Sequence, residues 1–185
     1  MTIRQARQDE GRQIAPLVLQ AMEEMVLQFT NSRDLTKGIN LFETFISQTA
    51  NQYSFENTLV AVENEEVIGS VTAYDGAKLT ELRRPFLDYI KKHYAYNQIP
   101  EEETEAGEFY IDTLSVSVGH QGKGIGKSLI EAVIAKGKAK GFSKIGLLVA
   151  IENPKAKSLY ERMGFKSAGI KNLMGGKYEH LVCTA

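Results

Sequence analysis

The spacing of apolar residues along the chain alternates between that of helices and that of strands. Apolar side chains recur every three or four positions in several stretches, which predicts amphipathic helices. These stretches are the run that follows Asp9, a plausible N-cap, then residues 35–48, 78–96 and 124–140, and a short helix after Asn153-Pro154. Alternating or β-branched runs predict strands over residues 2–6, 58–63, 67–74, 109–118, 144–151, 165–170 and 178–184.

The order of these elements predicts an α+β fold, a mixed α/β arrangement in three layers. The first two helices are expected to form a pair over one face of the sheet. The strand, helix and strand over residues 109–151 form a unit that should be parallel and right-handed. No internal repeat or low-complexity tract interrupts the chain, so we expect one domain over residues 1–185.

Composition limits the class of protein. The chain has 185 residues, of which 43% are hydrophobic and 24% charged, as expected for a globular domain. Its one cysteine, Cys183, excludes a disulfide within the chain and is expected to be a packed thiol in a reducing compartment. The first residues resemble no signal peptide and no apolar run is long enough for a membrane span, so we expect a cytoplasmic protein with no membrane partner.

The distribution of charge also excludes some partners. The net charge is −1, with 22 basic and 23 acidic residues, and the basic excess of a nucleic-acid-binding protein is absent. The densest charged run is acidic and contains Glu101, Glu102, Glu103, Glu105 and Glu108. This run is either a solvated loop or a segment that attracts a cationic substrate to a nearby site.

A glycine-rich turn before the helix of residues 124–140 carries the most informative chemistry. Glycines 122, 124 and 126 leave backbone amides open, and the amides at the start of a helix bind anions. The first turn carries Lys123 and Lys127 and no acidic residue until Glu131. Helices usually place acidic residues there, so the lysines indicate that a bound anion supplies the negative charge.

Three phosphate-binding motifs were compared with this turn. The dinucleotide pattern G-x-G-x-x-G fails, because its last glycine falls on Lys127 or Leu129. The P-loop pattern G-x-x-x-x-G-K-[ST] matches Gly126-Lys127-Ser128, but its first glycine falls on Gln121. The third pattern, Gln121-x-x-Gly124-x-Gly126, resembles the pyrophosphate loop of the GNAT acetyltransferase superfamily.

A second motif strengthens this resemblance. Asn153, Ala156, Tyr160 and Gly164-Phe165 have the spacing of another GNAT signature. The resemblance is specific over residues 107–171 and looser over residues 2–74, while residues 75–108 form a longer connection than the family's minimum. It implies a mostly antiparallel, twisted sheet of about seven strands with helices on both faces. It also implies a parallel central pair of strands that splay apart to admit acetyl-CoA.

The resemblance further implies roles for individual residues. Asn153 would contact the pantetheine arm, and Tyr160 would protonate the departing thiolate. The backbone would bind the acetyl carbonyl and the pantetheine amides through Leu114, Ser115 and Val116. The backbone would also bind the pyrophosphate through Gln121, Gly122, Lys123, Gly124, Ile125, Gly126 and Lys127.

The sequence offers several candidates for the general base. Some relatives carry a glutamate on the fifth strand. Here the corresponding segment, residues 144–151, contains no carboxylate. Asp112 is the best substitute, because strand alternation predicts that it shares a side with Tyr110 and Leu114 and could act through an ordered water. A structural role for this buried aspartate is equally compatible with the sequence. Weaker candidates are Glu108 and His120, and water alone could accept the proton.

These features lead to one functional hypothesis and two alternatives. The leading hypothesis is an N-acetyltransferase that moves the acetyl group of acetyl-CoA to an amine of a small-molecule or protein acceptor, by direct attack in a ternary complex. It needs no metal and no nucleic acid, and by analogy with the family a homodimer is expected. The alternatives are a non-catalytic acyl-CoA-binding sensor and a nucleotide-phosphate protein that uses Gly126-Lys127-Ser128.

Overall fold

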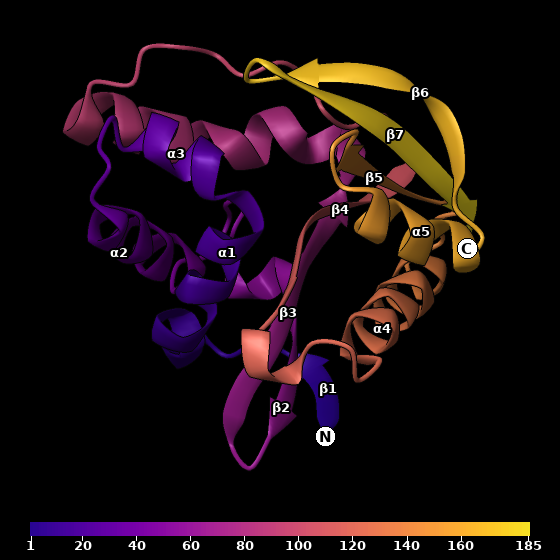
Figure 1. The fold of residues 1–185 in the computed structure, drawn as a ribbon. Helices are drawn as coiled ribbons and strands as arrows, with labels where there is room; N and C mark the ends of the chain where they lie inside the picture. Colours follow the sequence, from indigo (N-terminus) through magenta and orange to yellow (C-terminus); the bar gives the residue numbers. More distant parts are fainter.

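The computed structural model describes residues 1–185, and its sheet lies between two layers of helices (Figure 1). The strands are β1 (Thr2–Gln5), β2 (Thr58–Glu63), β3 (Glu66–Asp75), β4 (Glu108–Val116), β5 (Lys144–Ala150), β6 (Lys166–Leu173) and β7 (Gly176–Thr184). The helices are α1 (Gly11–Phe29), α2 (Leu35–Ile46), α3 (Leu79–Tyr94), α4 (Ile125–Ala139) and α5 (Pro154–Arg162). Helices α1, α2 and α3 cover one face of the sheet, and α4 and α5 cover the other.

The sheet has seven strands in the order β1-β2-β3-β4-β5-β7-β6. Only β4 and β5 are parallel, and every other neighbouring pair is antiparallel. Because β4 and β5 are parallel, they need a crossover connection, which α4 provides. The predicted fold is confirmed in its strand number, its parallel central pair and its two helical layers.

Two main hydrophobic cores hold the layers together. Between the sheet and α4, the completely buried Leu129 and Val133 pack with Ile111 of β4. Beneath α1, α2 and α3, a second core is rich in aromatic rings, including Phe42 and Phe86. Burying a side chain of this size stabilises the fold by roughly 1.5–3 kcal/mol. Helix α3, which the long connection of residues 75–108 contributes, is therefore anchored in this second core.

The start of α1 differs from the prediction. Asp9 does not cap the helix, since it lies in a 3-10 turn, Gln8–Glu10, and no side chain caps the first turn of α1. Glu10 of the same turn instead pairs with the Arg4 guanidinium, 2.9 Å from Nη1, and accepts the backbone N–H of Arg7. The start of the helix therefore includes an ion pair with β1 that the local sequence pattern does not reveal. No helix combines the length and apolar character that crossing a membrane requires.

Candidate active site

Strands β4 and β5 separate near the middle of the sheet. Their parallel pairing runs from Glu108 opposite Lys144 to Ile111 opposite Leu147 and ends there. Beyond this point β4 continues to Val116, and the only strand with which it pairs is β3 on its other side. The splay predicted from the resemblance is therefore present, and it opens the sheet towards the starts of α4 and α5.

A β-bulge at Asp112 lies where the two strands separate. Thr72 of β3 pairs with Thr113 and Ala73 pairs with Ile111, so Asp112 has no partner in the register. A bulge resets the alternation of side chains along a strand. The prediction that Asp112 and Leu114 share a side was therefore wrong. Leu114 packs against the core beneath α4, whereas Asp112 points with Tyr110 to the opposite face.

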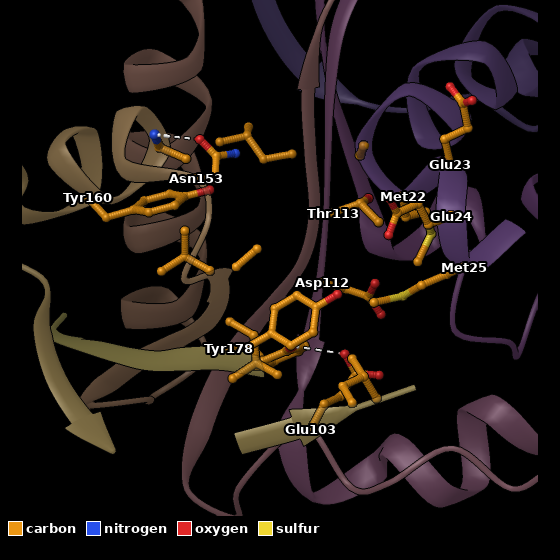
Figure 2. Close-up of a pocket in the computed structure, with 18 residues that line it drawn as sticks. Met22, Glu23, Glu24, Met25, Glu103, Asp112, Thr113, Asn153, Tyr160 and Tyr178 are labelled. Atoms are coloured by element: carbon orange, nitrogen blue, oxygen red, sulfur yellow. Dashed lines mark hydrogen bonds between the residues drawn. The ribbon is translucent and has the colours of Figure 1, made fainter. Parts of the chain in front are cut away.

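The space between the separated strands is a cleft of about 330 Å³ (Figure 2). It brings together four of the predicted site residues, Asp112, Leu114, Asn153 and Tyr160, from elements that are distant in sequence. Helix α5 contributes one wall and the second half of α1 the other. Further lining residues are Ala21, Met22, Glu23, Glu24, Met25, Glu103, Tyr110, Thr113, Leu148, Val149, Ala150, Ala156, Leu173 and Tyr178.

The α5 wall of the cleft is neutral. Tyr160 is only 9% exposed, its ring packs edge-on against Phe165 with the centroids 5.8 Å apart, and burial raises its pKa to about 12. Asn153 caps α5, because its Oδ1 accepts the Ala156 backbone N–H at 3.1 Å. Figure 2 shows the Tyr160 hydroxyl and the Asn153 amide pointing into the cleft from this wall.

The opposite end of the cleft is acidic, and we call the part lined by Glu23, Glu24, Glu103 and Asp112 the acceptor end. Asp112 Oδ2 accepts hydrogen bonds from Gln52 Nε2 at 2.6 Å and from the Tyr74 hydroxyl. Burial raises the pKa of Asp112, although these two donors oppose the shift. The acceptor end therefore holds a carboxylate that is oriented by hydrogen bonds and is more basic than an ordinary aspartate.

Glu103 is a site residue that the sequence did not single out. It is 9% exposed and its Oε2 accepts a hydrogen bond from the Tyr110 hydroxyl at 2.9 Å. Its Oε1 lies 3.8 Å from Arg83 Nη1. Burial, with a further contribution from the charge of Asp112, raises the pKa of Glu103 to about 8. The acidic run of residues 101–108 was the only signal, and nothing in it distinguished the glutamate that turns inward.

Helix α1 shapes the rim of the acceptor end. The backbone of Met22 is not helical, with φ −144° and ψ 38°, so α1 kinks where it passes the cleft. Glu23 and Glu24 follow the kink and are exposed at the rim. Thr113 lies inside the cleft, where its hydroxyl is buried without a hydrogen-bond partner. A buried hydroxyl without a partner costs free energy, which a hydrogen bond to a ligand group would recover.

The glycine-rich turn forms a separate groove at the start of α4. Gly122 and Gly124 have φ values of +78° and +82°, in the left-handed region that favours glycine. No side chain caps α4, and a Cβ atom at either glycine would meet only open space. The groove is lined by Val116, His120, Gln121, Gly122, Gly124, Ile125, Gly126, Lys127, Leu159 and Arg162. Uncapped amides, lysine and arginine together fit a diphosphate.

Two details of this groove differ from the sequence analysis. Lys123 is the only residue of the predicted pyrophosphate loop that does not line it. Arg162, at the end of α5, lines the groove and was not predicted, since its position in the sequence resembles an ordinary cation in the last turn of a helix. A cation from α5 is therefore available to the same anion as the amides of α4.

The predicted backbone contacts on β4 are partly in use. The Val116 carbonyl accepts Gln20 Nε2 at 2.9 Å and Gln121 Nε2 at 3.0 Å. The Ser115 hydroxyl accepts Gln20 Nε2 at 2.8 Å and lines neither the cleft nor the groove. The roles of Leu114, Ser115 and Val116 stay predictions, and a ligand at the Val116 carbonyl would have to displace a glutamine amide.

The weaker candidates for the base have other partners. Glu108 accepts the Glu105 N–H at 2.8 Å and lies 2.9 Å from His180 Nε2, and it does not line the cleft. His120 Nδ1 lies 2.8 Å from the Ser117 hydroxyl, beside the groove. Cys183 is buried outside the cleft, and burial raises its pKa to about 11, which disfavours the reactive thiolate. Among the candidates, Asp112 alone faces the cleft.

The comparison with known families agrees with this geometry. The model of the acetyltransferase (GNAT) family matches residues 19–165. This range contains the splayed strands, the groove and the whole of α5, including Tyr160. The chain belongs to the GNAT acetyltransferase family.

Individual relatives support the assignment at different levels. A crystal structure described as an acetyltransferase is 30% identical, has a TM-score of 0.84 and matches over 100% of this chain and 99% of its own. An N-acetyltransferase from Staphylococcus aureus Mu50 is 24% identical, has a TM-score of 0.87 and covers 98% and 100% of the two chains, which shows the shared fold. The mycothiol acetyltransferase of Beutenbergia cavernae is 34% identical over 73 residues, which are 40% of this chain and 23% of that protein.

Proposed function

We propose that the protein is an N-acetyltransferase that moves the acetyl group of acetyl-CoA to an amine of a small or protein acceptor, by direct attack in a ternary complex. The observation that supports this most is the cleft itself. A buried phenol, Tyr160, and an oriented carboxylate, Asp112, line opposite walls of one cavity at the splay of β4 and β5. The amine must lose a proton as it attacks the thioester carbonyl carbon, and the thiolate gains from a proton donor as it leaves. The reaction therefore needs a proton acceptor and a proton donor on two sides of this carbon.

The groove supports acetyl-CoA as the donor. The uncapped amides of the α4 start would bind the pyrophosphate, with Lys127 and Arg162 as counter-ions. Asn153 caps α5 through Oδ1, which leaves its Nδ2 group as a donor towards the pantetheine arm. When bound, acetyl-CoA supplies a thioester whose carbonyl carbon takes the amine nitrogen while its carbon–sulfur bond breaks.

Tyr160 is proposed as the donor to the leaving sulfur. Its pKa of about 12 keeps it protonated at any physiological pH. An ordinary thiol has a pKa near 8.5, so complete transfer of the phenolic proton to a thiolate would be uphill. Tyr160 therefore acts mainly by holding a hydrogen bond to the sulfur as negative charge develops on it.

Asp112 is proposed as the base that takes the proton from the acceptor amine, through an ordered water. The Gln52 amide and the Tyr74 hydroxyl hold its Oδ2, which fixes the carboxylate in one orientation. Its raised pKa makes it a better proton acceptor than an ordinary aspartate. The bulge places it on the α1 side of β4, where the other carboxylates of the acceptor end also lie.

The direct test is an assay of thiol release from acetyl-CoA over a panel of amines, with calorimetry of acetyl-CoA binding beside it. We expect acetyl-CoA to bind and at least one amine to be acetylated, as verified by product mass. Binding without transfer to any amine would instead support the alternative of an acyl-CoA sensor. Absence of heat with acetyl-CoA, together with binding of ATP, would show that the groove holds a different nucleotide.

A further inference from the structure

The two ends of the cleft differ sharply in charge. Four acidic residues line the acceptor end, Glu23, Glu24, Glu103 and Asp112, and no lysine, arginine or histidine lines any part of the cleft. The α5 end contributes only neutral side chains. An amine must lose its positive charge before it can attack a thioester. The reacting nitrogen therefore cannot balance these carboxylates in the reactive complex.

The inner carboxylates are short of positive charge. Arg83 is the nearest cation to Glu103, with Nη1 3.8 Å from Oε1, and it also donates to the carbonyl oxygens of Pro100 and Glu101. Neutral donors, the Tyr110 hydroxyl for Glu103 and Gln52 and Tyr74 for Asp112, supply the other contacts. Arg83 is therefore the cation nearest to both buried acids, with Lys171 contributing at longer range to Glu103, and burial favours the protonated form of Glu103.

The position of Glu103 is built rigidly into the fold. Helix α3 is anchored by Phe86 in the aromatic core, and Arg83 of the same helix holds the returning chain at Pro100. The long connection of residues 75–108 thereby carries Glu103 to the inner wall of the cleft, where the Tyr110 hydroxyl orients it. A solvated loop would show none of these contacts, so the connection has a defined role at the site.

Thr113 provides a second, independent indication of a polar ligand. Its side chain is 4% exposed, lines the cleft and has no hydrogen-bond partner for its hydroxyl. A hydroxyl oxygen can accept a hydrogen bond from an amine or ammonium group. Thr113 follows the bulge at Asp112 and precedes Leu114, so it lines the cleft where β4 and β5 have separated.

Spacing along β4 limits the length of the ligand. Glu103 contacts the strand at Tyr110, and the splay reaches Leu114 four residues later, with one residue taken up by the bulge. At about 3.3 Å per residue, the backbones of Tyr110 and Leu114 are roughly 10 Å apart along β4. The cleft of about 330 Å³ must also admit the end of the acyl donor, and this volume lies at the small end of ligand sites.

Resting on the proposed acetyl transfer, we propose that the acceptor is a small aliphatic diamine or polyamine, one of whose amines is acetylated while a second, charged ammonium group binds Glu103. Thr113 and Asp112 face the reacting amine, and Glu103 holds the distant one. Glu23 and Glu24 add negative charge at the rim and attract the cationic acceptor. Glu103 is thereby a specificity-determining residue for the acceptor.

Binding of the ammonium group should be coupled to the release of a proton from Glu103. Before the ammonium arrives, burial and the charge of Asp112 raise the pKa of Glu103 to about 8, so Glu103 is largely protonated at neutral pH. The nearest other charged or titratable groups are Tyr110 on β4, Arg83 on α3 and Lys171 on β6, whose Nζ lies 3.4 Å from the Glu103 carbonyl oxygen. The charge of Glu103 also acts on the neutral phenols of Tyr53, Tyr74 and Tyr178. An ammonium group at Glu103 favours its ionised form, so binding should release a proton.

The first experiment compares two probes of equal size, 1,4-diaminobutane and 1-aminopentane, as acceptors. We expect kcat/KM for the diamine to exceed that for the monoamine by about 100-fold, because the monoamine has no second ammonium group to bind Glu103. Glu103→Gln should lower the diamine value about 30-fold and leave the monoamine within about threefold. Glu102→Gln, a matched change at an exposed neighbour, should alter neither. Equal use of the two amines by the wild type, or equal losses for both in Glu103→Gln, would overturn the proposal.

A second experiment separates this subsite from acetyl transfer. Calorimetry of 1,4-diaminobutane against the coenzyme A complex, in buffers of different ionisation enthalpy, should show proton release at pH 7 that Glu103→Gln abolishes. Such binding without acetylation of any amine would keep the subsite and reject the transferase function. Acetylation with no preference for the diamine would keep the transferase function and reject the subsite. Glu103→Asp keeps the charge on a shorter side chain and should move the preference towards the longer 1,5-diaminopentane. An unchanged preference in this variant would contradict the role of Glu103, even if Glu103→Gln failed to fold.

Discussion

The groove at the start of α4 and the acceptor end of the cleft are built in different ways. The groove is formed mainly by one continuous segment, residues 116–127, in which three of the lining residues are glycines, with Leu159 and Arg162 added from α5. The acceptor end is made of side chains from α1, from the connection after α3 and from β4. A site made of backbone amides depends on local conformation, whereas a site made of carboxylates depends on how distant elements pack. Substitutions should therefore affect the two regions differently.

The largest effect is expected where the backbone itself defines the site. Gly124→Glu should lower acetyl-CoA affinity by at least about 100-fold, or about 2.7 kcal/mol, because it places a carboxylate where the diphosphate binds and strains a residue with φ +82°. Calorimetry would measure the loss. Gly141→Glu, at the other end of α4 with φ +87°, carries the same strain and should bind normally. Equal affinity in the two variants would show that the groove is not the donor site.

A large effect on turnover, with little effect on donor binding, is expected at Asp112. Asp112→Asn keeps the shape and an acceptor for Tyr74 but removes the base, so turnover should fall about 100-fold. Because the pKa of Asp112 is raised, the acid limb of the wild-type pH profile should lie above the ordinary aspartate range, and the variant should lack this limb. The exposed Asp88→Asn serves as the control. An acid limb that persists in Asp112→Asn would assign the base elsewhere.

A smaller loss is expected for the leaving-group donor. Tyr160→Phe should reduce turnover about tenfold, since it removes one hydrogen bond to the departing sulfur, and acetyl-CoA affinity should stay within a few-fold. With a pKa of about 12, Tyr160 should produce no basic limb below about pH 11 in the wild-type profile. Single-turnover kinetics would separate chemistry from product release, with Tyr94→Phe on α3 as the control. Unchanged turnover would remove Tyr160 from the mechanism.

The buried Glu103 at the acceptor end should also make the free energy of unfolding fall as the pH rises. The pKa of Glu103 is raised from 4.5 to about 8, so the folded protein holds a proton that the unfolded chain has released over this interval. This contribution to stability is complete below about pH 4.5 and is lost as the pH rises through about 8. Glu103→Gln should therefore lose less stability than the wild type as pH rises, by up to about 1.4 kcal/mol per pH unit. Urea unfolding at several pH values would measure this difference, with Glu102→Gln as the control, and parallel curves would contradict the buried carboxylate.

The smallest effect is expected at the one side-chain cation that the groove takes from α5. Arg162→Gln should weaken acetyl-CoA binding about threefold to fivefold, and the difference should shrink at high salt because the side chain is exposed. Lys155→Gln, on the same helix but outside the groove, makes the same change in charge and should have no effect. If both substitutions weaken binding equally, Arg162 makes no specific contact in the groove and contributes only to the positive electrostatic field around α5.

The regions also differ in how far the sequence predicts them. Residues 109–151 show a strand, a glycine-rich turn and an amphipathic helix in direct succession, so local rules identify β4, the groove and α4 to within one or two residues at most ends. Glu103 could not be identified in this way. Its burial depends on α3 docking into the aromatic core and on Arg83 holding the chain at Pro100, and neither contact is local.

The bulge at Asp112 was missed for a related reason. A regular strand over residues 109–118 would alternate its side chains strictly between the two faces of the sheet. No residue in this run is an obvious signal that the strand contains a bulge. The bulge is visible only in the pairing with β3, where Thr72 and Ala73 face Thr113 and Ile111. Arg162 was missed because its type and helix position have an ordinary explanation at a helix end. Interactions between elements therefore determine what the pattern within one element leaves open.

The unpaired position of Asp112 in β4 also affects how this protein can change. Removing this single residue would restore a regular ladder with β3, and Ile111 and Thr113 would keep their present partners and faces. The cleft could therefore lose its inner carboxylate by deletion of one codon without turning any packed side chain over. Insertion of a different residue at the same place would change the chemistry of the wall equally simply. This position offers a route to new acceptor chemistry that leaves both hydrophobic layers intact.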